Sequence, residues 1–185
     1  MVPIIIFFFK KDSLHWSVWP SVILCLTGGY LLTDFYDAIV RLGDTLVILG
    51  ALFWSTHIIF TGMIVKKYNL PLTIGAIQTF LVALFSFIIG LIYEEFVTEN
   101  ILNEIGSILY AGILSGGFAF VLQIYAQKNI TPAPAAIIFS LEGVFATIAA
   151  WFLLSQILGI NNLIGCAFIL SGVLLSQLVP LIKKT

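Results

Sequence analysis

Apolar stretches long enough to cross a lipid bilayer dominate this chain, and the charged residues fall almost entirely in the gaps between them. A membrane-spanning helix needs about 20 mostly apolar residues. Six segments approach or exceed that length: Leu14–Thr33, Thr45–Val65, Leu70–Tyr93, Ile105–Gln127, Ala135–Leu154 and Ile160–Ile182. Backbone polar groups inside a membrane must be satisfied within helices or a closed barrel, and no strand pattern competes here. We therefore expect an all-α integral membrane protein with a bundle of six transmembrane helices.

The positive and negative charges separate by side when the gaps are assigned alternately to the two faces of the membrane. One side receives every lysine and the other side receives Arg41 alone. The lysines are Lys10, Lys11, Lys66, Lys67, Lys128, Lys183 and Lys184. Most Asp and Glu residues fall on the Arg41 side, with Asp12 as the exception. Because lysine and arginine in short loops stay in the cytoplasm, we expect a cytoplasmic C-terminus, and a bacterial inner membrane is the simplest host.

The composition excludes several other classes of protein. Hydrophobic residues make up 61% of the chain and charged residues 9%, whereas a soluble domain carries roughly 25% charged residues. The near-zero net charge leaves no basic face for nucleic acid. Cys25 and Cys166 lie inside apolar segments and imply no disulfide framework. No metal-ligand spacing, phosphate-binding glycine loop or catalytic dyad is present, so we expect neither a cofactor nor a metal, and no enzymatic activity.

A short apolar run, Val2–Phe9, precedes Lys10 and Lys11 at the start of the chain. A secretory signal has the reverse order, with its positive charges first. Nine residues of helix rise only about 13 Å, while the hydrocarbon core is about 30 Å thick. The run therefore predicts a partial helix, either the end of a span whose beginning is missing or a segment that lies at the membrane interface.

Glu142 is the one carboxylate placed within an apolar segment, at the eighth position of Ala135–Leu154. A charged residue at a helix centre costs on the order of 3 kcal/mol on insertion scales and usually faces protein or water. Such a glutamate can bind a proton or a substrate along a transport pathway. The alternative is a glutamate that is hydrogen-bonded within the protein and fixes helix packing.

Three further polar side chains lie within the apolar segments: His57, Gln78 and Gln123. His57 could pair with Glu142 or relay a proton, or it could bond to a backbone carbonyl. The two glutamines could contact a polar solute, or they could hydrogen-bond between helices. We assign all three, together with Glu142, as candidates for a substrate or proton pathway.

Small residues recur at helical spacing and mark places where helices can approach closely. Gly112 and Gly116 are four residues apart, and Gly172 shares a face with Ser176. Small residues at this spacing let helix backbones pack tightly in membranes. We therefore expect Gly112, Gly116 and Gly172 to lie in helix–helix contacts, although glycines can also widen a pathway.

Several short motifs follow one another between Gly43 and Val173. They are Gly43-Asp44 ahead of Leu49-Gly50-Ala51-Leu52-Phe53-Trp54, then Gln78, Tyr125-Ala126-Gln127-Lys128, Leu141-Glu142-Gly143-Val144-Phe145-Ala146 and Gly165-Cys166-Ala167-Phe168-Ile169-Leu170-Ser171-Gly172-Val173. In this order they resemble the repeat of EamA-type transporters in the drug/metabolite transporter superfamily. Two positions depart from the family pattern. Gly143 replaces a proline, which would straighten a kink, and Ser155-Gln156 replaces Gly-Glu, which removes one family carboxylate.

The resemblance implies an architecture and a function. Family members have ten helices arranged as two inverted repeats of five. Residues 42–185 would form a complete second repeat, and residues 1–41 would be the tail of a first repeat, comprising a partial helix and one transmembrane helix. The implied activity is secondary transport, with export of a small metabolite or drug by alternating access, and the partners are the lipid bilayer and a small-molecule solute.

The same layout leaves other interpretations open. A missing first repeat would remove half of the transport site. The chain could then be a remnant that does not transport, or an accessory membrane subunit that needs a partner chain. A homodimer could also supply the missing half.

Overall fold

The computed structural model describes residues 1–10, 14–33 and 42–182. These residues form helices and short connections, without a strand in the described ranges, which confirms the all-α class. The sorting of charges by side can be followed only in part. Lys11, Asp12, Asp34, Asp37, Arg41, Lys183 and Lys184 lie outside the described residues.

In the described part of the chain, five apolar helices or runs of consecutive helices are long enough to cross a membrane. They are α3 (Leu42–Tyr68), α4 (Pro71–Tyr93), the run of α6 (Ile105–Leu109), η1 (Tyr110–Ala119) and α7 (Phe120–Gln127), the pair α8 (Pro132–Phe139) and α9 (Leu141–Leu154), and α10 (Ile160–Ile182). The shorter helices are α1 (Val2–Lys10), α2 (Val18–Leu32) and α5 (Thr98–Asn103). The spans agree with the apolar segments of the sequence, so the chain is a multi-pass membrane protein.

The first expected span, Leu14–Thr33, forms a helix only over Val18–Leu32. A helix of 15 residues is about 22 Å long and does not by itself cover the hydrocarbon core of about 30 Å. Two turn hydrogen bonds precede it, from Val18 N to the His15 carbonyl and from Trp19 N to the Trp16 carbonyl. Pro20 lacks an N–H and is tolerated best in the first turn of a helix, which agrees with a helix that begins at Val18.

The described residues divide into two compact units. The first comprises Met1–Phe60 with Thr131–Thr185, and the second comprises Thr61–Ile130. In the first unit a buried apolar cluster joins α1, α2, the first part of α3, α8, α9 and α10. Its members are Val2, Ile6, Val18, Ile58, Ile59, Ala133, Ile137, Val144, Ile169 and Val173.

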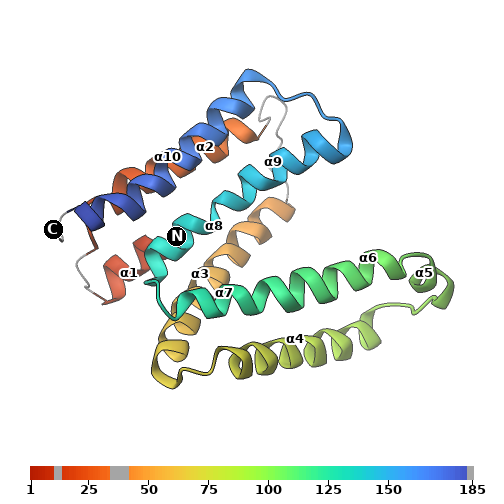
Figure 1. Ribbon diagram of the computed structural model, residues 1–185. Helices are drawn as coiled ribbons and strands as arrows, with labels where there is room; N and C mark the ends of the chain where they lie inside the picture. The colour runs from red at the N-terminus through yellow and green to blue at the C-terminus, as the bar shows by residue number, and fades with distance from the viewer. Residues whose placement is uncertain (11–13, 34–41, 183–185) are drawn as a thin grey trace. The chain divides into compact units, whose positions relative to one another are not determined.

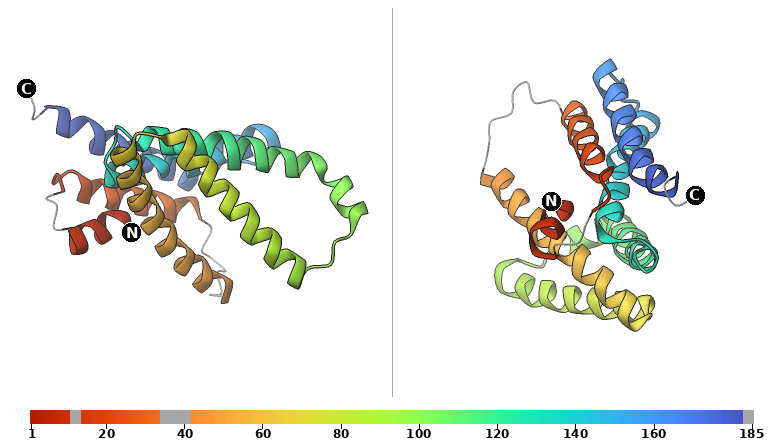
Figure 2. Two further views of the ribbon diagram at one scale, coloured as in Figure 1. Left: turned by 90° about the horizontal axis from the view of Figure 1, so that it is seen from below. Right: turned by 90° about the vertical axis from the view of Figure 1, so that its left-hand side faces the viewer.

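Helices α2 and α10 lie side by side along most of the length of α2 (Figure 1, Figure 2). Glycine makes this approach possible, because a Cβ placed on Gly28 would lie 2.6 Å from the carbonyl oxygen of Gly165. At the other end of the contact, a Cβ on Gly172 would lie 2.9 Å from the carbonyl oxygen of Ser21. Gly28 faces Gly165 while Ser21 faces Gly172, so the two helices are antiparallel.

The contacts between α2 and α10 repeat under an approximate two-fold relation. Gly28 and Gly172 are 144 residues apart, as are Cys25 and Ile169. The same offset relates Ser21 to Gly165, so the contact of Gly28 with Gly165 maps onto that of Gly172 with Ser21. Cys25 and Ile169 exchange places under this relation and meet at its centre, where the Cys25 Sγ lies 3.9 Å from the Ile169 carbonyl oxygen.

The span Pro132–Leu154 is divided at Ser140, where the sequence predicts one continuous helix. Ser140 N donates to the Ile137 carbonyl at 3.1 Å, and Gly143 N donates to the Ser140 carbonyl at 3.3 Å. Both bonds join residues three apart, as in a 3₁₀ turn, and such a turn within a helix often marks a hinge. Ser140 itself keeps right-handed helical angles, with φ of −61° and ψ of −17°, and the expectation that Gly143 straightens a kink in this span stays a prediction.

In the second unit, α4 packs against α7. A Cβ on Gly75 of α4 would lie 3.0 Å from Val121 Cγ2 and 3.5 Å from Ile124 Cδ1, both on α7. Figure 1 shows α5 and the adjoining connection linking the far end of α4 to α6. This connection carries Glu94, Glu95 and Glu99, which belong to the acidic residues that the sequence assigns to the Arg41 side.

Candidate functional site

Glu142 lies in the first turn of α9, directly after the interruption at Ser140, and its side chain is exposed. The start of a helix carries a partial positive charge from its unpaired N–H groups. The N-terminus of α9 therefore favours a carboxylate at this depth of the span. The next residue, Gly143, faces α2 and α10, since a Cβ there would lie 3.5 Å from Leu32 Cδ1 and 4.0 Å from Ile169 Cδ1.

His57 belongs to the part of α3 that lies in the first unit, and it is half-buried. Its ring stacks on that of Trp54, with ring centroids 5.2 Å apart and planes inclined by 25°. The pairing of His57 with Glu142 stays a prediction.

Gln78 and Gln123 lie in the second unit, on α4 and α7. The Gln78 Nε2 donates a hydrogen bond to Thr61 Oγ1 of α3 at 3.2 Å, so this amide joins two helices. Its Oε1 is buried without a hydrogen-bond partner in the described part of the chain, and it can accept a hydrogen bond from a solute or water. Gln123 is half-buried. Glu142 and His57 thus lie in the first unit, whereas Gln78 and Gln123 lie in the second.

The sequence matches the EamA-like transporter family over residues 41–178. The chain belongs to the EamA-like transporter family. Its resemblance to EamA-type members of the drug/metabolite transporter superfamily is thereby confirmed.

Several curated proteins are similar to this EamA-like chain. An uncharacterized transporter of Archaeoglobus fulgidus is 28% identical over 96% of this chain and 56% of its own length. The uncharacterized transporter YoaV of Bacillus subtilis is 25% identical over 76% of this chain and 48% of its own length. The Arabidopsis thaliana protein WALLS ARE THIN 1 is 26% identical over 71% of this chain and 34% of its own length. This EamA-like chain spans about half the length of the first two relatives. No solved structure matches it.

The three glycines expected in helix contacts have different surroundings in this EamA-like chain. Gly172 lies against Ser21 and Cys25 of α2. Gly112 and Gly116 lie in η1, a π-helical segment in which each turn holds an extra residue. A Cβ on Gly112 would meet nothing within 4 Å, and a Cβ on Gly116 would lie 3.3 Å from the carbonyl oxygen of Ala111 in the same segment. The neighbours of Gly116 thus come from its own wide turn, whereas those of Gly172 come from another helix.

Two polar residues were missed as site candidates in the sequence. Thr61 receives the Gln78 hydrogen bond, but a threonine within an apolar span gives no signal of its own. Gln127 is 1% exposed, and both of its amide atoms lack a hydrogen-bond partner among the described residues. Gln127 stands next to Lys128 at the end of the segment Ile105–Gln127, a position typical of the membrane surface, so a buried amide is not expected there from the sequence. No group of three or more His, Cys, Asp or Glu suited to a metal occurs in the described part.

The Gln78–Thr61 hydrogen bond is expected to contribute modestly to stability. Interhelical hydrogen bonds in membranes average about 0.6 kcal/mol in double-mutant cycles. We expect Gln78→Leu and Thr61→Val each to lower the free energy of unfolding, with a coupling of about 0.5–1 kcal/mol between them. Unfolding in mixed micelles of the single and double variants measures this coupling. Strict additivity would show that the contact contributes nothing, and Gln123→Leu is the matched control on α7.

Proposed function

We propose that this chain contributes a five-helix repeat, residues 42–185, to a secondary transporter that exports a small metabolite or drug by alternating access. The observation that supports this proposal most strongly is the match to the EamA-like transporter family over residues 41–178. In transporters with inverted repeats, the substrate binds near the bilayer midplane at the repeat interface, and interrupted helices supply contacts there. The interruption at Ser140, followed by Glu142, has the features of such a helix.

The two-fold relation between α2 and α10 supports the proposal that residues 1–41 are the tail of another copy of the repeat. Leu26-Thr27-Gly28 corresponds to Leu170-Ser171-Gly172 under the 144-residue offset. The correspondence extends to α1, whose Ile4 and Phe8 take the places of Ile148 and Phe152 in α9. Two copies related by a two-fold axis in the membrane plane have opposite orientations, and the antiparallel packing of α2 and α10 has that geometry.

Within the proposed transporter, Glu142 binds the proton or the substrate, and His57, Gln78 and Gln123 are secondary polar contacts. This assignment is supported by the exposed carboxylate at the start of α9 and by the Gln78 Oε1, which has no protein partner in the described ranges. Both can bind a polar solute or a proton without first breaking a hydrogen bond within the described protein.

Export can be tested in cells that express the full chain. Medium and cell extract are compared by mass spectrometry between this strain, an empty-vector strain and a strain expressing Glu142→Gln at the same membrane level. The proposal predicts that at least one small polar metabolite accumulates in the medium only with the unmodified chain. Identical metabolite profiles in all three strains would contradict export by this chain. They would favour the alternative of a membrane subunit that needs a partner chain.

We propose further that the protein lies in the cell membrane, the inner membrane of a bacterium. Its lysine side faces the cytoplasm. Lys66 and Lys67 end α3, and the acidic residues Glu94, Glu95 and Glu99 follow α4 at the other side of the span. A green fluorescent protein fused to the C-terminus should fluoresce, and alkaline phosphatase inserted after Glu99 should be active. The reverse pattern of the two reporters would invert the orientation.

A further inference from the structure

The charged residues of the second unit, Thr61–Ile130, are separated between its two ends. Its lysines lie in the last turn of α3 or directly after α7: Lys66, Lys67 and Lys128. Its carboxylates all follow the other end of α4: Glu94, Glu95, Glu99 and Glu104. Since α4 has 23 residues, the two groups are about 34 Å apart along this helix. The end of the unit that carries the lysines is called the lysine end below.

The end of α3 lies beside the start of α4. Gln78 of α4 donates a hydrogen bond to Thr61 of α3, so the two helices pack together along their first common turns. Asn69 joins them in a left-handed conformation with φ of 57°, which asparagine tolerates better than most residues. The chain therefore reverses sharply after α3, and Lys66 and Lys67 are held at the level where α4 begins.

The end of α7 reaches the same level. Figure 1 shows α7 running back along α4, and a Cβ on Gly75 of α4 would lie 3.5 Å from Ile124 Cδ1 of α7. Pro71 begins α4 four residues before Gly75, and Lys128 follows Ile124 by four residues. At the helical rise per residue, both positions lie about 6 Å beyond the contact. Lys128 therefore lies beside the start of α4, as the two lysines of α3 do.

The positive charge at the lysine end exceeds what the helix ends require. The carbonyl end of a helix carries about half a negative charge, which lysines in the last turn complement. The ends of α3 and α7 together present about one negative charge against three ammonium groups. Lys66 and Lys67 are exposed, and Lys128 is half-buried. Positive charge therefore remains at the lysine end for a ligand of opposite sign.

The lysine end lies at the depth of the lipid headgroups. A helix as long as α4 covers about 34 Å, and the hydrocarbon core is about 30 Å thick, so the start of α4 reaches the headgroup region. Tyr68 is exposed at this level, as expected of an aromatic residue at the membrane interface. The Lys67 Nζ lies 5.1 Å from the centroid of the Tyr68 ring. The ammonium groups are therefore placed where lipid phosphates occur.

We infer that the lysine end of the second unit binds an anionic phospholipid, with Lys66, Lys67 and Lys128 around its phosphate group. Ammonium groups donate strong, charge-assisted hydrogen bonds to phosphate oxygens. A zwitterionic lipid also has a phosphate, but its own ammonium group opposes the attraction to the lysines. The ligand is therefore selected by its net negative charge. This site does not depend on the proposed transport activity.

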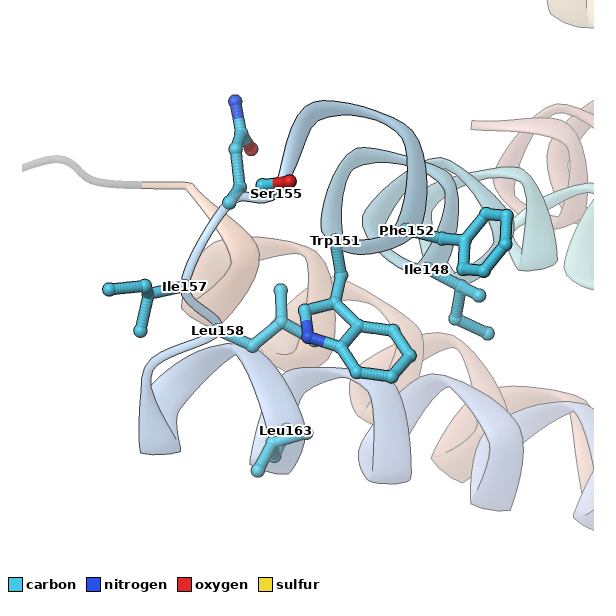
Figure 3. A pocket seen from close by; sticks show the side chains of 8 residues that line it. Ile148, Trp151, Phe152, Ser155, Ile157, Leu158 and Leu163 are labelled. Atoms are coloured by element: carbon cyan, nitrogen blue, oxygen red, sulfur yellow. The ribbon is translucent and has the colours of Figure 1, made fainter.

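The first unit offers an uncharged surface for comparison. Figure 3 shows the groove where α9 turns into α10, which is lined by apolar side chains together with Ser155 and Gln156. The Trp151 indole projects into it from α9 (Figure 3). Its lining carries no charge that would separate an anionic from a zwitterionic lipid. The peptide that contains Trp151 is therefore an internal reference for lipid contact without charge selection.

Photolabelling in vesicles tests the inference. The full chain is reconstituted with phosphatidylglycerol or phosphatidylethanolamine, each with the same acyl chains and a photoactivatable group close to the glycerol. Each lysine near the membrane surface contributes about fivefold to the binding of an anionic lipid. We therefore expect phosphatidylglycerol to label the peptide that contains Tyr68 at least about tenfold more than phosphatidylethanolamine does. The two lipids should label the Trp151 peptide equally.

Substitution of the three lysines should remove this preference. The combined variant Lys66→Gln, Lys67→Gln and Lys128→Gln is expected to be labelled equally by the two lipids. Arginine at the same three positions keeps the charge and should keep the preference. Lys128→Gln alone should reduce the preference severalfold, and it tests the inference if the combined variant does not insert into the membrane.

A charge-matched variant separates the lysine end from the net charge of the protein. Lys10→Gln combined with Lys183→Gln and Lys184→Gln removes three positive charges outside the second unit, and it should retain the preference. Loss of the preference in this control would assign it to net charge and overturn the inference. Equal labelling of the unmodified chain by the two lipids would also overturn it, as would a preference that survives in the glutamine variant. Loss of the preference on addition of glycerol phosphate would identify a soluble anion, rather than a lipid, as the ligand.

Discussion

Replacing Gly28 with alanine is expected to separate α2 from α10 and to lower the free energy of unfolding by about 1–3 kcal/mol, the usual range for overpacking a dense contact. The new Cβ would lie 2.6 Å from the Gly165 carbonyl oxygen, 2.7 Å from Ile169 Cγ1 and 3.0 Å from Ile169 N. Two of these three neighbours are backbone atoms, which cannot rotate away as a flexible side chain can. The two helices must therefore move apart, and the contacts between α2 and α10 weaken along their whole length.

Gly29 supplies a control on the neighbouring residue. A Cβ there would meet nothing within 4 Å, and alanine is favoured over glycine within a helix by about 1 kcal/mol. Gly29→Ala is therefore expected to leave the stability unchanged or to raise it. Thermal unfolding of the two variants in the same detergent, followed by light scattering and by tryptophan fluorescence, measures the difference. Equal melting temperatures for the two variants would show that the close approach of α2 and α10 is absent in the folded protein.

Under the two-fold relation, the same effect is expected at the other end of the contact between α2 and α10. Gly172→Ala would place a Cβ 2.9 Å from both Cys25 Sγ and the Ser21 carbonyl oxygen, so it should cost a similar amount. The double variant with Gly28→Ala should cost less than the sum of the single variants, because a first substitution already moves the helices apart and neighbouring sites are coupled.

Hydropathy and charge predicted the spans well, because both follow directly from the cost of placing polar groups in lipid. The five long spans of the structure coincide with five of the six expected segments. The packing of one helix against another could be predicted less well from the sequence. The spacing of small residues indicated a contact face around Gly172. Spacing alone does not predict which helix packs against that face. The structure shows that the partner is α2, and that Gly28 makes the corresponding close contact from that helix.

The sequence also could not predict where the backbone hydrogen bonds of a helix change from the α-helical pattern to another. Short 3₁₀ and π-helical stretches occur inside ordinary helices, and the apolar residues that fill a membrane span do not distinguish among these three forms. The interruption at Ser140 and the wide turns of η1 therefore left no trace in the apolar pattern. Glu142 could be placed within its span from the sequence, whereas its position in the first turn of a new helix could not.

The position of Glu142 within the span leads us to expect a large effect of its substitution on export. Glu142→Gln is expected to reduce export of the identified metabolite at least about tenfold, because loss of a proton carrier or ligand in the membrane removes a function rather than a packing contact. The side chain is exposed and lies beside the N-terminus of α9. Glutamine keeps the size of the side chain and lacks the charge that lipid disfavours, so the amount of folded protein in the membrane should stay the same or rise.

The direction of these two readouts separates a pathway role from a structural one. If Glu142 fixed helix packing through its charge, Glu142→Gln would lower the melting temperature together with export. If it carries a proton or contacts the solute, export falls while the melting temperature holds, and Glu142→Asp restores part of the activity. Glu104→Gln is the control, since Glu104 lies in the acidic connection ahead of α6 and outside the spans. Full export by Glu142→Gln at normal protein levels would remove Glu142 from the mechanism and leave the pathway to Gln78, Gln123 and His57.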